Sequence, residues 1–170
     1  RIEDDIETIF PNARVLRMDA DTTMAKYSYE EKLKAFSKGE YDILLGTQMV
    51  AKGLNFPNVT LVGVISIDQQ LYNDDFRSSE KAFDLLTQVV GRSGRGDYKG
   101  KAVIQTALPD NDIITLASLQ DYEGFFEMEN IIRKAMVYPP YCDICSLTFM
   151  SENYMKCNTS ASRFLEQIKS

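Results

Sequence analysis

Hydrophobic and polar positions recur along the chain with two different periods. Apolar residues at helical spacing, such as Ile2, Ile6 and Ile9, form amphipathic stretches, and short runs rich in Val, Ile and Leu lie between them. The pattern predicts helices over residues 2–10, 28–39 and 78–90, and strands over 14–19, 42–47, 59–67 and 101–107. Strands that alternate with helices indicate an α/β fold with a parallel sheet and helices on both faces.

Local signals refine two of these elements. Ser28 followed by Glu31 matches a helix capping box, and Gly39 is placed to end the same helix. The run at 59–67 is almost entirely apolar, which is typical of a strand covered on both faces.

The pattern changes after Pro109. Two helices are predicted over 110–119 and 122–137, and the segment YPPY then interrupts the chain because two prolines cannot continue a helix. A strand over 142–150 and a helix over 154–170 follow. We therefore divide the chain into residues 1–110, a helical connector at 111–140, and the start of a small α+β domain at 141–170.

Composition limits the classes of function. The 170 residues are 44% hydrophobic and 26% charged, as in a globular protein with a core, and no apolar run is long enough to span a membrane. The net charge of −6 means that any site for a polyanion must be a local patch. Histidine, the commonest general base, is absent. Three cysteines without a secretion signal favour the reducing cytoplasm, and the abrupt ends lead us to expect a piece of a longer protein.

Polar loops follow the first three predicted strands, at 19–23, 46–56 and 66–76. Ligands of parallel α/β sheets bind at this carboxyl edge. In the second loop Gly46 and Gly53 allow close approach to the backbone, Thr47 offers a hydroxyl group and Lys52 a positive charge, a set that suits phosphate. The alternative is a set of ordinary turns.

The stretch LLTQVVGRSGRGD, residues 85–97, contains Gln88, Arg92 and Arg95 at positions i, i+4 and i+7, on one helical face. Guanidinium groups beside glycines suit bidentate recognition of phosphate. The alternative is a helix end whose arginines form ion pairs with carboxylates such as Asp97.

These stretches resemble a known family. GTQMVAKGLNFPNV and TQVVGRSGRG are similar to motifs V and VI of superfamily 2 helicases, and the DDFRSSEKAFDLLTQ lead-in and the later YPPY segment are similar to the primosomal replication-restart DNA helicases (the primosomal protein N′ family). The resemblance covers almost the whole chain. It implies that residues 1–110 form the second RecA-like lobe of an ATP-dependent 3′-to-5′ DNA helicase.

The resemblance also implies roles for single residues. Arg92 and Arg95 match the arginines that reach the ATP phosphates, with Arg95 at the arginine-finger position, and Gln88 matches the glutamine near them. The remaining matches are Gly53 and Asn55 for nucleotide, and Thr47, Gln48, Lys52, Thr22 and Thr23 for DNA. Many superfamily members carry an acid where Asn55 stands.

A phosphate-binding loop GxxxxGK[ST] and an Asp-Glu pair for magnesium do not occur in the sequence. In the resembled family these groups lie on the first RecA-like lobe, and zinc ligands lie upstream of the region matched here. ATP and Mg²⁺ are therefore expected as cofactors of the full-length protein, and this chain alone is expected to be inactive. The implied partners are single-stranded and forked DNA, primosome proteins, single-stranded-DNA-binding protein and the first lobe.

Cys142 and Cys145 have the spacing of half a zinc site, but no second pair follows, and we interpret them as small buried residues of a strand. Two rival functions remain open. One is the lobe of another superfamily 2 translocase in repair or branch migration, and the other is a non-catalytic protein-binding module. Convergence of Gln88, Arg92, Arg95 and the 46–56 loop on one exposed edge would favour a motor.

Overall fold

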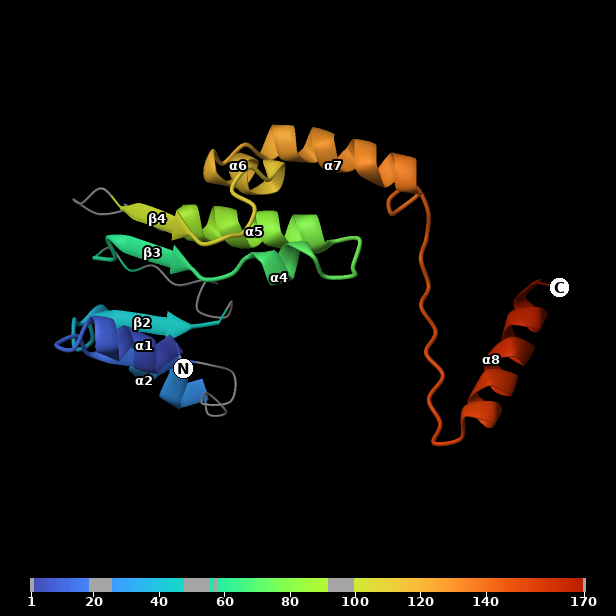
Figure 1. Ribbon diagram of the computed structural model, residues 1–170, viewed down its shortest axis with the longest axis horizontal. Helices are drawn as coiled ribbons and strands as arrows, with labels where there is room; N and C mark the ends of the chain where they lie inside the picture. The colour runs from blue at the N-terminus through green and yellow to red at the C-terminus, as the bar shows by residue number, and fades with distance from the viewer. Residues whose placement is uncertain (1, 19–25, 48–55, 57, 92–99, 170) are drawn as a thin grey trace. The chain divides into compact units, whose positions relative to one another are not determined.

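The computed structural model of the chain describes residues 2–18, 26–47, 56, 58–91 and 100–169. Within these residues short parallel strands alternate with helices (Figure 1), and the predicted α/β class is confirmed. The chain divides into two compact units, residues 1–130 and 131–170. No helix in the described part is long and apolar enough to cross a bilayer.

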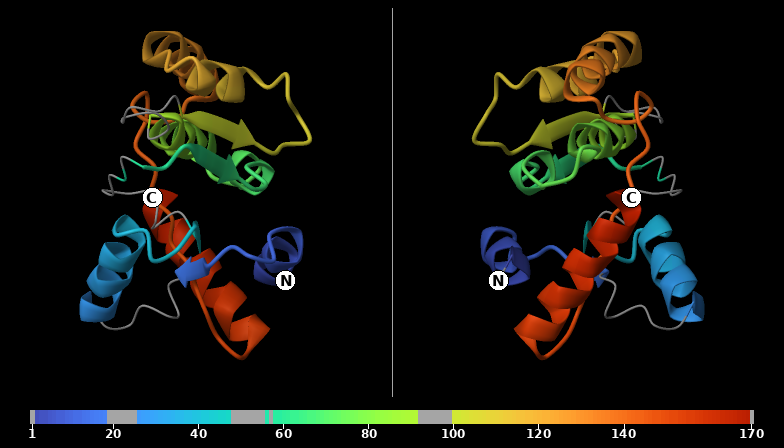
Figure 2. Two further views of the ribbon diagram at one scale, coloured as in Figure 1. Left: turned by 90° about the vertical axis from the view of Figure 1, so that its left-hand side faces the viewer. Right: turned by 90° about the vertical axis from the view of Figure 1, so that its right-hand side faces the viewer.

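The first sheet pairs β1 (Val15–Met18) with β2 (Ile43–Gly46) in parallel. Helices α1 (Ile2–Ile9) and α2 (Lys26–Ser37) lie on its two sides (Figure 2). Along β1, Leu16 and Met18 are buried and Arg17 between them is exposed, which is the alternation of a strand with one covered face.

Helix α2 begins at Lys26, two residues before the predicted start. Ser28 therefore lies inside the helix, and its predicted role as N-cap is wrong. The predicted end is confirmed. Gly39 has φ of +76°, its N–H bonds to the carbonyl of Phe36, and the N–H of Glu40 bonds to that of Ala35. This pair of bonds is the Schellman motif, and it requires the left-handed conformation that glycine adopts without strain.

The second sheet pairs β3 (Leu61–Val64) with β4 (Lys101–Ile104), also in parallel, with Leu61 opposite Lys101. Between these strands run α4 (Asp68–Leu71) and α5 (Ser78–Val90). Hydrogen bonds among the described residues join the strands in two separate pairs. Hydrophobic patterns predict strands but do not specify which edges pair.

Strand β3 is shorter and more open than predicted. Leu61 and Ile65 are 61% and 52% exposed, so the prediction of two covered faces is wrong within the described residues. Ser66 has φ of 60° and ends the extended backbone. Ile67 consequently does not extend the strand. It is 2% exposed and packs in the hydrophobic core with residues of the following helices.

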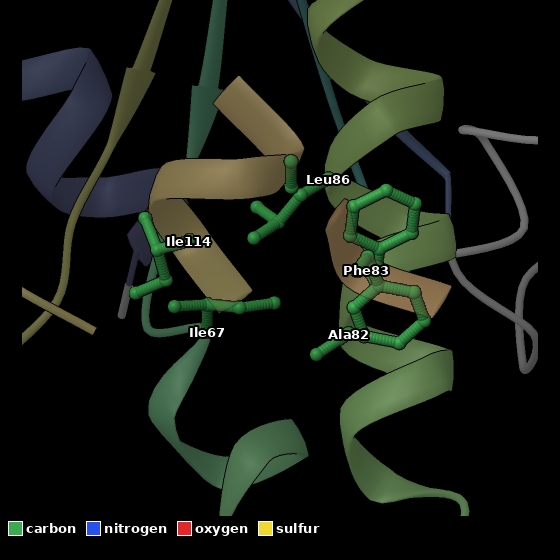
Figure 3. Packing of buried hydrophobic residues seen from close by; sticks show 7 residues of the cluster. Ile67, Ala82, Phe83, Leu86 and Ile114 are labelled. Atoms are coloured by element: carbon green, nitrogen blue, oxygen red, sulfur yellow. The ribbon is translucent and has the colours of Figure 1, made fainter. Parts of the chain in front are cut away.

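The main core lies where α5 packs against the two helices that follow β4 (Figure 3), and Val64 of β3 and Ile104 of β4 pack against it. Helix α6 (Asp112–Ser118) starts at Asn111, whose side chain accepts hydrogen bonds from the N–H groups of Ile113 and Ile114. Helix α7 (Tyr122–Met136) contributes Phe125, whose ring stacks on Phe83 of α5 with centroids 4.1 Å apart. The buried cluster consists of Ile67, Ala82, Phe83, Leu86, Ile114, Ala117 and Phe125.

The second unit contains the end of α7, a non-helical segment, and α8 (Tyr154–Lys169). The strand predicted over 142–150 is wrong, since these residues have no strand hydrogen bonding. A strand needs a neighbour to bond with, and the described residues of this unit supply none. Phe149 packs against Phe164 of α8 with ring centroids 5.7 Å apart.

Candidate functional site

Two of the predicted site residues, Gln88 and Thr47, lie within the described residues. Gln88 is half-buried in the last turn of α5, and Thr47 is exposed directly after β2. No hydrogen bond joins these two residues in the described part of the chain. The other predicted site residues lie outside the described residues: Thr22, Thr23, Gln48, Lys52, Gly53, Asn55, Arg92 and Arg95. The shared helical face of Gln88, Arg92 and Arg95 therefore remains a prediction.

The residues that flank the predicted segments are described, and they show where each segment is attached. Thr47 connects the segment 48–55 to the carboxyl end of β2. On the other side, Phe56 packs edge-on against Phe36 of α2, with ring centroids 4.9 Å apart. The residue that follows Asn55 is thus held by an aromatic contact on α2.

The segment 92–99 begins at the end of α5. Gly91 is the C-cap, and its N–H donates to the carbonyl of Thr87 at 2.9 Å. The hydroxyl of Thr87 in turn donates to the carbonyl of Phe83 at 2.9 Å. Leu86, in the same turn, is fully buried in the core cluster, so the helix turn that carries Gln88 packs against that core.

Both predicted nucleotide segments lead into the same strand pair. The N–H of Lys101, at the start of β4, donates to the carbonyl of Thr60, just before β3, at 2.8 Å. Thr60 lies five residues after Asn55, and Lys101 lies six residues after Arg95. One hydrogen bond therefore joins the described residues by which the two segments enter the β3–β4 pair.

The loop 66–76 was predicted to be polar and without regular structure, yet it contains the short helix α4. Asp68, its first residue, accepts hydrogen bonds from Thr106 and Ala107 beyond β4. The carboxylate of Asp75 accepts hydrogen bonds from the side chains of Arg77 and Lys81 and from the backbone N–H of Arg77. Lys81 and Arg77 hold the pKa of the Asp75 carboxyl well below its usual value.

A second ion pair connects the β1–β2 sheet to the turn after α2. Arg14 donates to both carboxylate oxygens of Asp42, at 2.9 Å each, and to the carbonyl of Gly39 at 2.7 Å. The hydrogen bonds from Arg14 lower the pKa of Asp42, and those with Asp42 raise the pKa of Arg14. These arginine contacts are structural and involve none of the predicted site residues.

The cysteines differ from their prediction. Cys145 is exposed and Cys142 is half-buried, so their interpretation as buried residues of a strand is wrong. The thiol of Cys142 donates to the carbonyl of Val137 at 2.8 Å. Among the described residues no group of three or more His, Cys, Asp or Glu side chains is placed to hold a metal ion.

Sequence analysis missed two residues that connect these elements, Asp68 and Gln120. Asp68 is the first acidic residue after the third predicted strand, a position where carboxylates often bind backbone groups, and this signal could have found it. Gln120 donates from its side chain to the carbonyl of Thr87 at 2.9 Å. No local sequence signal marks a contact across 33 positions.

Comparison with known proteins identifies the class of domain. Residues 2–97 match the family model described as the helicase conserved C-terminal domain. The chain therefore belongs to this family of helicase domains. The matched range includes both motif-like stretches, at residues 46–59 and 87–96.

The similarity extends beyond that domain. The chain is 47% identical to the replication restart protein PriA of Bacillus subtilis (strain 168), over 99% of this chain and 21% of the relative. It is 43% identical to the PriA of Chlamydia muridarum, over 99% of this chain and 22% of the relative. The resemblance to the replication-restart helicases is thereby confirmed. The chain spans about a fifth of the length of these curated relatives.

Among solved structures, the C-terminal domain of the DEAD-box protein Dbp5 aligns with a TM-score of 0.47 at 16% sequence identity. The alignment covers 79% of this chain and 77% of that one.

Proposed function

We propose that the chain is the second RecA-like lobe of a longer ATP-dependent DNA helicase that acts in replication restart. Its role is to complete an ATP site whose phosphate-binding loop and magnesium ligands belong to the first lobe, and to contact the DNA backbone. The observation that carries the proposal is the similarity to replication restart proteins along 99% of the chain.

The arrangement of the described residues supports a nucleotide-facing role. Residues 48–55 and 92–99 carry Asn55 and Arg95, and the hydrogen bond between Lys101 and Thr60 joins the strands into which they lead. Arg95 acts as the arginine finger, Arg92 supports it, and Gln88 lies in the helix turn that precedes both. Gly53 and Asn55 contact the nucleotide from the other segment. Guanidinium suits this task because its charge does not titrate and its fork matches phosphate oxygens.

The DNA-facing role is assigned to residues at the start of the segment after β2 and in the loop after β1. Thr47 is exposed at the carboxyl edge of the β1–β2 sheet, where ligands of parallel sheets bind. Gln48, Lys52, Thr22 and Thr23 complete this set. Movement is 3′ to 5′ on single-stranded DNA, and closure of the two lobes on ATP drives it.

The limits of the lobe at residues 1–110, the connector at 111–140 and the C-terminal start at 141–170 are part of the proposal. The proposal also includes a cytoplasmic location, ATP and Mg²⁺ as cofactors of the longer protein, and zinc ligands upstream of this region. Its proposed partners are primosome proteins and single-stranded-DNA-binding protein. The longer protein should act on forked DNA.

The test is Arg95→Ala in the full-length protein. An arginine finger binds the negative charge that develops in the transition state. Its loss should therefore lower kcat by at least about 100-fold and change ATP affinity much less. Arg95→Lys should recover little activity, because it keeps the charge and loses the fork. DNA-stimulated ATPase measured over a range of ATP concentrations separates the two effects.

The 170-residue chain itself should neither hydrolyse ATP nor bind it at micromolar concentrations. Titration calorimetry with MgATP and a phosphate-release assay with single-stranded DNA measure both. Turnover by the chain, or a normal kcat in the Arg95→Ala protein, would refute the proposal. A normal kcat would also favour a non-catalytic binding module.

A further inference from the structure

Gln120 connects the corner between α6 and α7 to the far end of α5. Its Nε2 group donates to the carbonyl oxygen of Thr87 at 2.9 Å, and the N–H of Gly91 donates to the same oxygen, also at 2.9 Å. A carbonyl oxygen has two lone pairs and can accept both bonds. The carbonyl of Thr87 already has its intrahelical donor in Gly91, so the amide of Gln120 adds a second bond that ties the last turn of α5 to the corner before α7.

The contact lies at the functional end of the helix. Thr87 directly precedes Gln88, and Gly91 directly precedes Arg92. A Cβ atom placed on Gly91 would lie 3.7 Å from Oε1 of Gln120 and 3.1 Å from the carbonyl oxygen of Thr87. The amide of Gln120 therefore lies beside the residue from which the arginine segment starts.

The backbone of Gln120 adopts a conformation that its side chain does not favour. Its φ is 58°, in the left-handed region, and the bond from the N–H of Asp121 to the carbonyl of Leu116 closes a glycine-type end to α6. A glycine would form the same turn with less strain. Gln120 is also exposed, so burial gives no reason for a glutamine at this position. The bond to Thr87 does give one.

The corner that carries Gln120 is rigidly attached to α5. Phe125 stacks on Phe83 with an angle of 11° between the rings, and Ala117 and Leu86 of the same core cluster are both fully buried. Figure 3 shows Ala82, Phe83 and Leu86 of α5 facing the other core residues. An amide held by this framework fixes the position of the helix end, because the packed core allows little displacement.

We propose that Gln120 is a positioning residue that holds the last turn of α5, and with it Gln88, in the arrangement needed for ATP hydrolysis. The inference rests on the proposed function. It adds that the helices after the conserved helicase domain, which ends its match at residue 97, take part in ordering the site. Gln120 itself does not touch the nucleotide.

The test uses Gln120→Gly and Gln120→Asn in the full-length protein. Both residues accept the left-handed conformation, and neither carries an amide that reaches Thr87. The expected result is a fall in kcat of about tenfold with little change in KM for ATP, because a misplaced group weakens chemistry more than binding. The melting temperature should stay close to that of the unchanged protein, since relief of backbone strain offsets the lost hydrogen bond.

A matched control is Val137→Gly. Val137 also follows a helix with a left-handed φ, 55°, and it belongs to the second unit, which contains none of the residues assigned to the site. This variant relieves the same kind of strain and should leave kcat unchanged. Amide hydrogen exchange adds an independent readout: peptides that contain Val90 and Gly91 should exchange faster in Gln120→Gly and normally in Val137→Gly.

Arg95→Ala is assayed beside these variants to separate the two proposals. If Arg95→Ala loses activity while both Gln120 variants keep wild-type kcat, the positioning inference is refuted and the proposed function stands. If Arg95→Ala is fully active, the proposed function fails and the inference fails with it. A Gln120→Gly protein whose melting temperature falls together with its activity would show a purely structural role and would also refute the inference.

Discussion

The carboxylate of Asp68 joins the loop after β3 to the loop after β4. It accepts a hydrogen bond from the hydroxyl of Thr106 at 2.6 Å and from the N–H of Ala107 at 3.1 Å. The hydroxyl of Thr106 in turn accepts from the N–H of Leu108 at 3.0 Å. The carboxyl edge of the second sheet is therefore fixed by one side chain, independently of the ladder between the strands.

Asp68→Ala should destabilise the protein by about 1–3 kcal/mol, because hydrogen bonds to a charged, partly buried group are among the stronger ones and their donors would be left without this partner. Urea unfolding of the two proteins gives the difference. Asp74→Ala, an exposed aspartate in the same loop, should change stability by less than about 0.5 kcal/mol. Equal effects of the two substitutions would contradict the assignment.

Phe125→Ala should be the most damaging of the substitutions considered. Phe125 is 4% exposed and stacks on Phe83, so its removal leaves a cavity between α5 and α7 that costs about 3–5 kcal/mol. The neighbouring Phe126 is 54% exposed, and Phe126→Ala should cost less than about 1 kcal/mol. Thermal unfolding followed by circular dichroism distinguishes these values, and similar melting temperatures would argue against the packing of α7 on α5.

Gly39→Ala tests the end of α2. A Cβ on Gly39 meets no atom within 4 Å, so the cost comes from φ of +76° alone and should be about 1 kcal/mol after the gain from a less flexible unfolded chain. Gly63→Ala in β3 is the control, since Gly63 also has open space but no positive φ. That change should be neutral or stabilising by up to about 1 kcal/mol. The reverse order of the two melting temperatures would show that the turn does not need glycine.

Asp42→Asn should make stability less dependent on pH in acid. Because Arg14 lowers the folded-state pKa of Asp42, the carboxylate contributes stability above its unfolded pKa of about 4, and this contribution is lost as the pH falls through the lower folded value. The variant should therefore be less stable than the unchanged protein at pH 7, and the gap should narrow below about pH 4. Chemical denaturation at a series of pH values measures it. As a control, Asp110→Asn at an exposed turn should leave the dependence of stability on pH unaltered. A stability difference between Asp42→Asn and the unchanged protein that stays constant with pH would contradict the prediction.

Lys52→Ala and Thr47→Ala should weaken DNA binding by the longer protein more than they weaken ATP binding. Loss of one lysine–phosphate contact should reduce the slope of log affinity against log salt by about 0.7 for single strands. Thr47→Ala removes no charge and should lower affinity with the slope unchanged. Fluorescence anisotropy with labelled single-stranded DNA at several salt concentrations tests both, and wild-type values for both variants would make these residues purely structural.

Most of the elements of this protein are determined locally and could be predicted from the sequence. The apolar periodicity predicted α1, α5 and each strand of the two pairs, and Gly39 marked the end of α2, because side-chain period and the conformational freedom of glycine act within a few residues. The resemblance of the stretches around Thr47 and Arg92 to helicase motifs was equally local, and the family match bears it out.

Only the tertiary structure decided how these elements are connected. The strand predicted over 142–150 is absent because a strand needs a neighbouring strand to bond with. The strand predicted over 59–67 ends early because the left-handed backbone of Ser66 directs Ile67 into the core. The hydrogen bonds from Lys101 to Thr60 and from Gln120 to Thr87 join residues more than 30 positions apart. Such contacts depend on the packing of α5, α6 and α7 around one core, and this packing is a property of the whole unit that no short stretch of sequence carries.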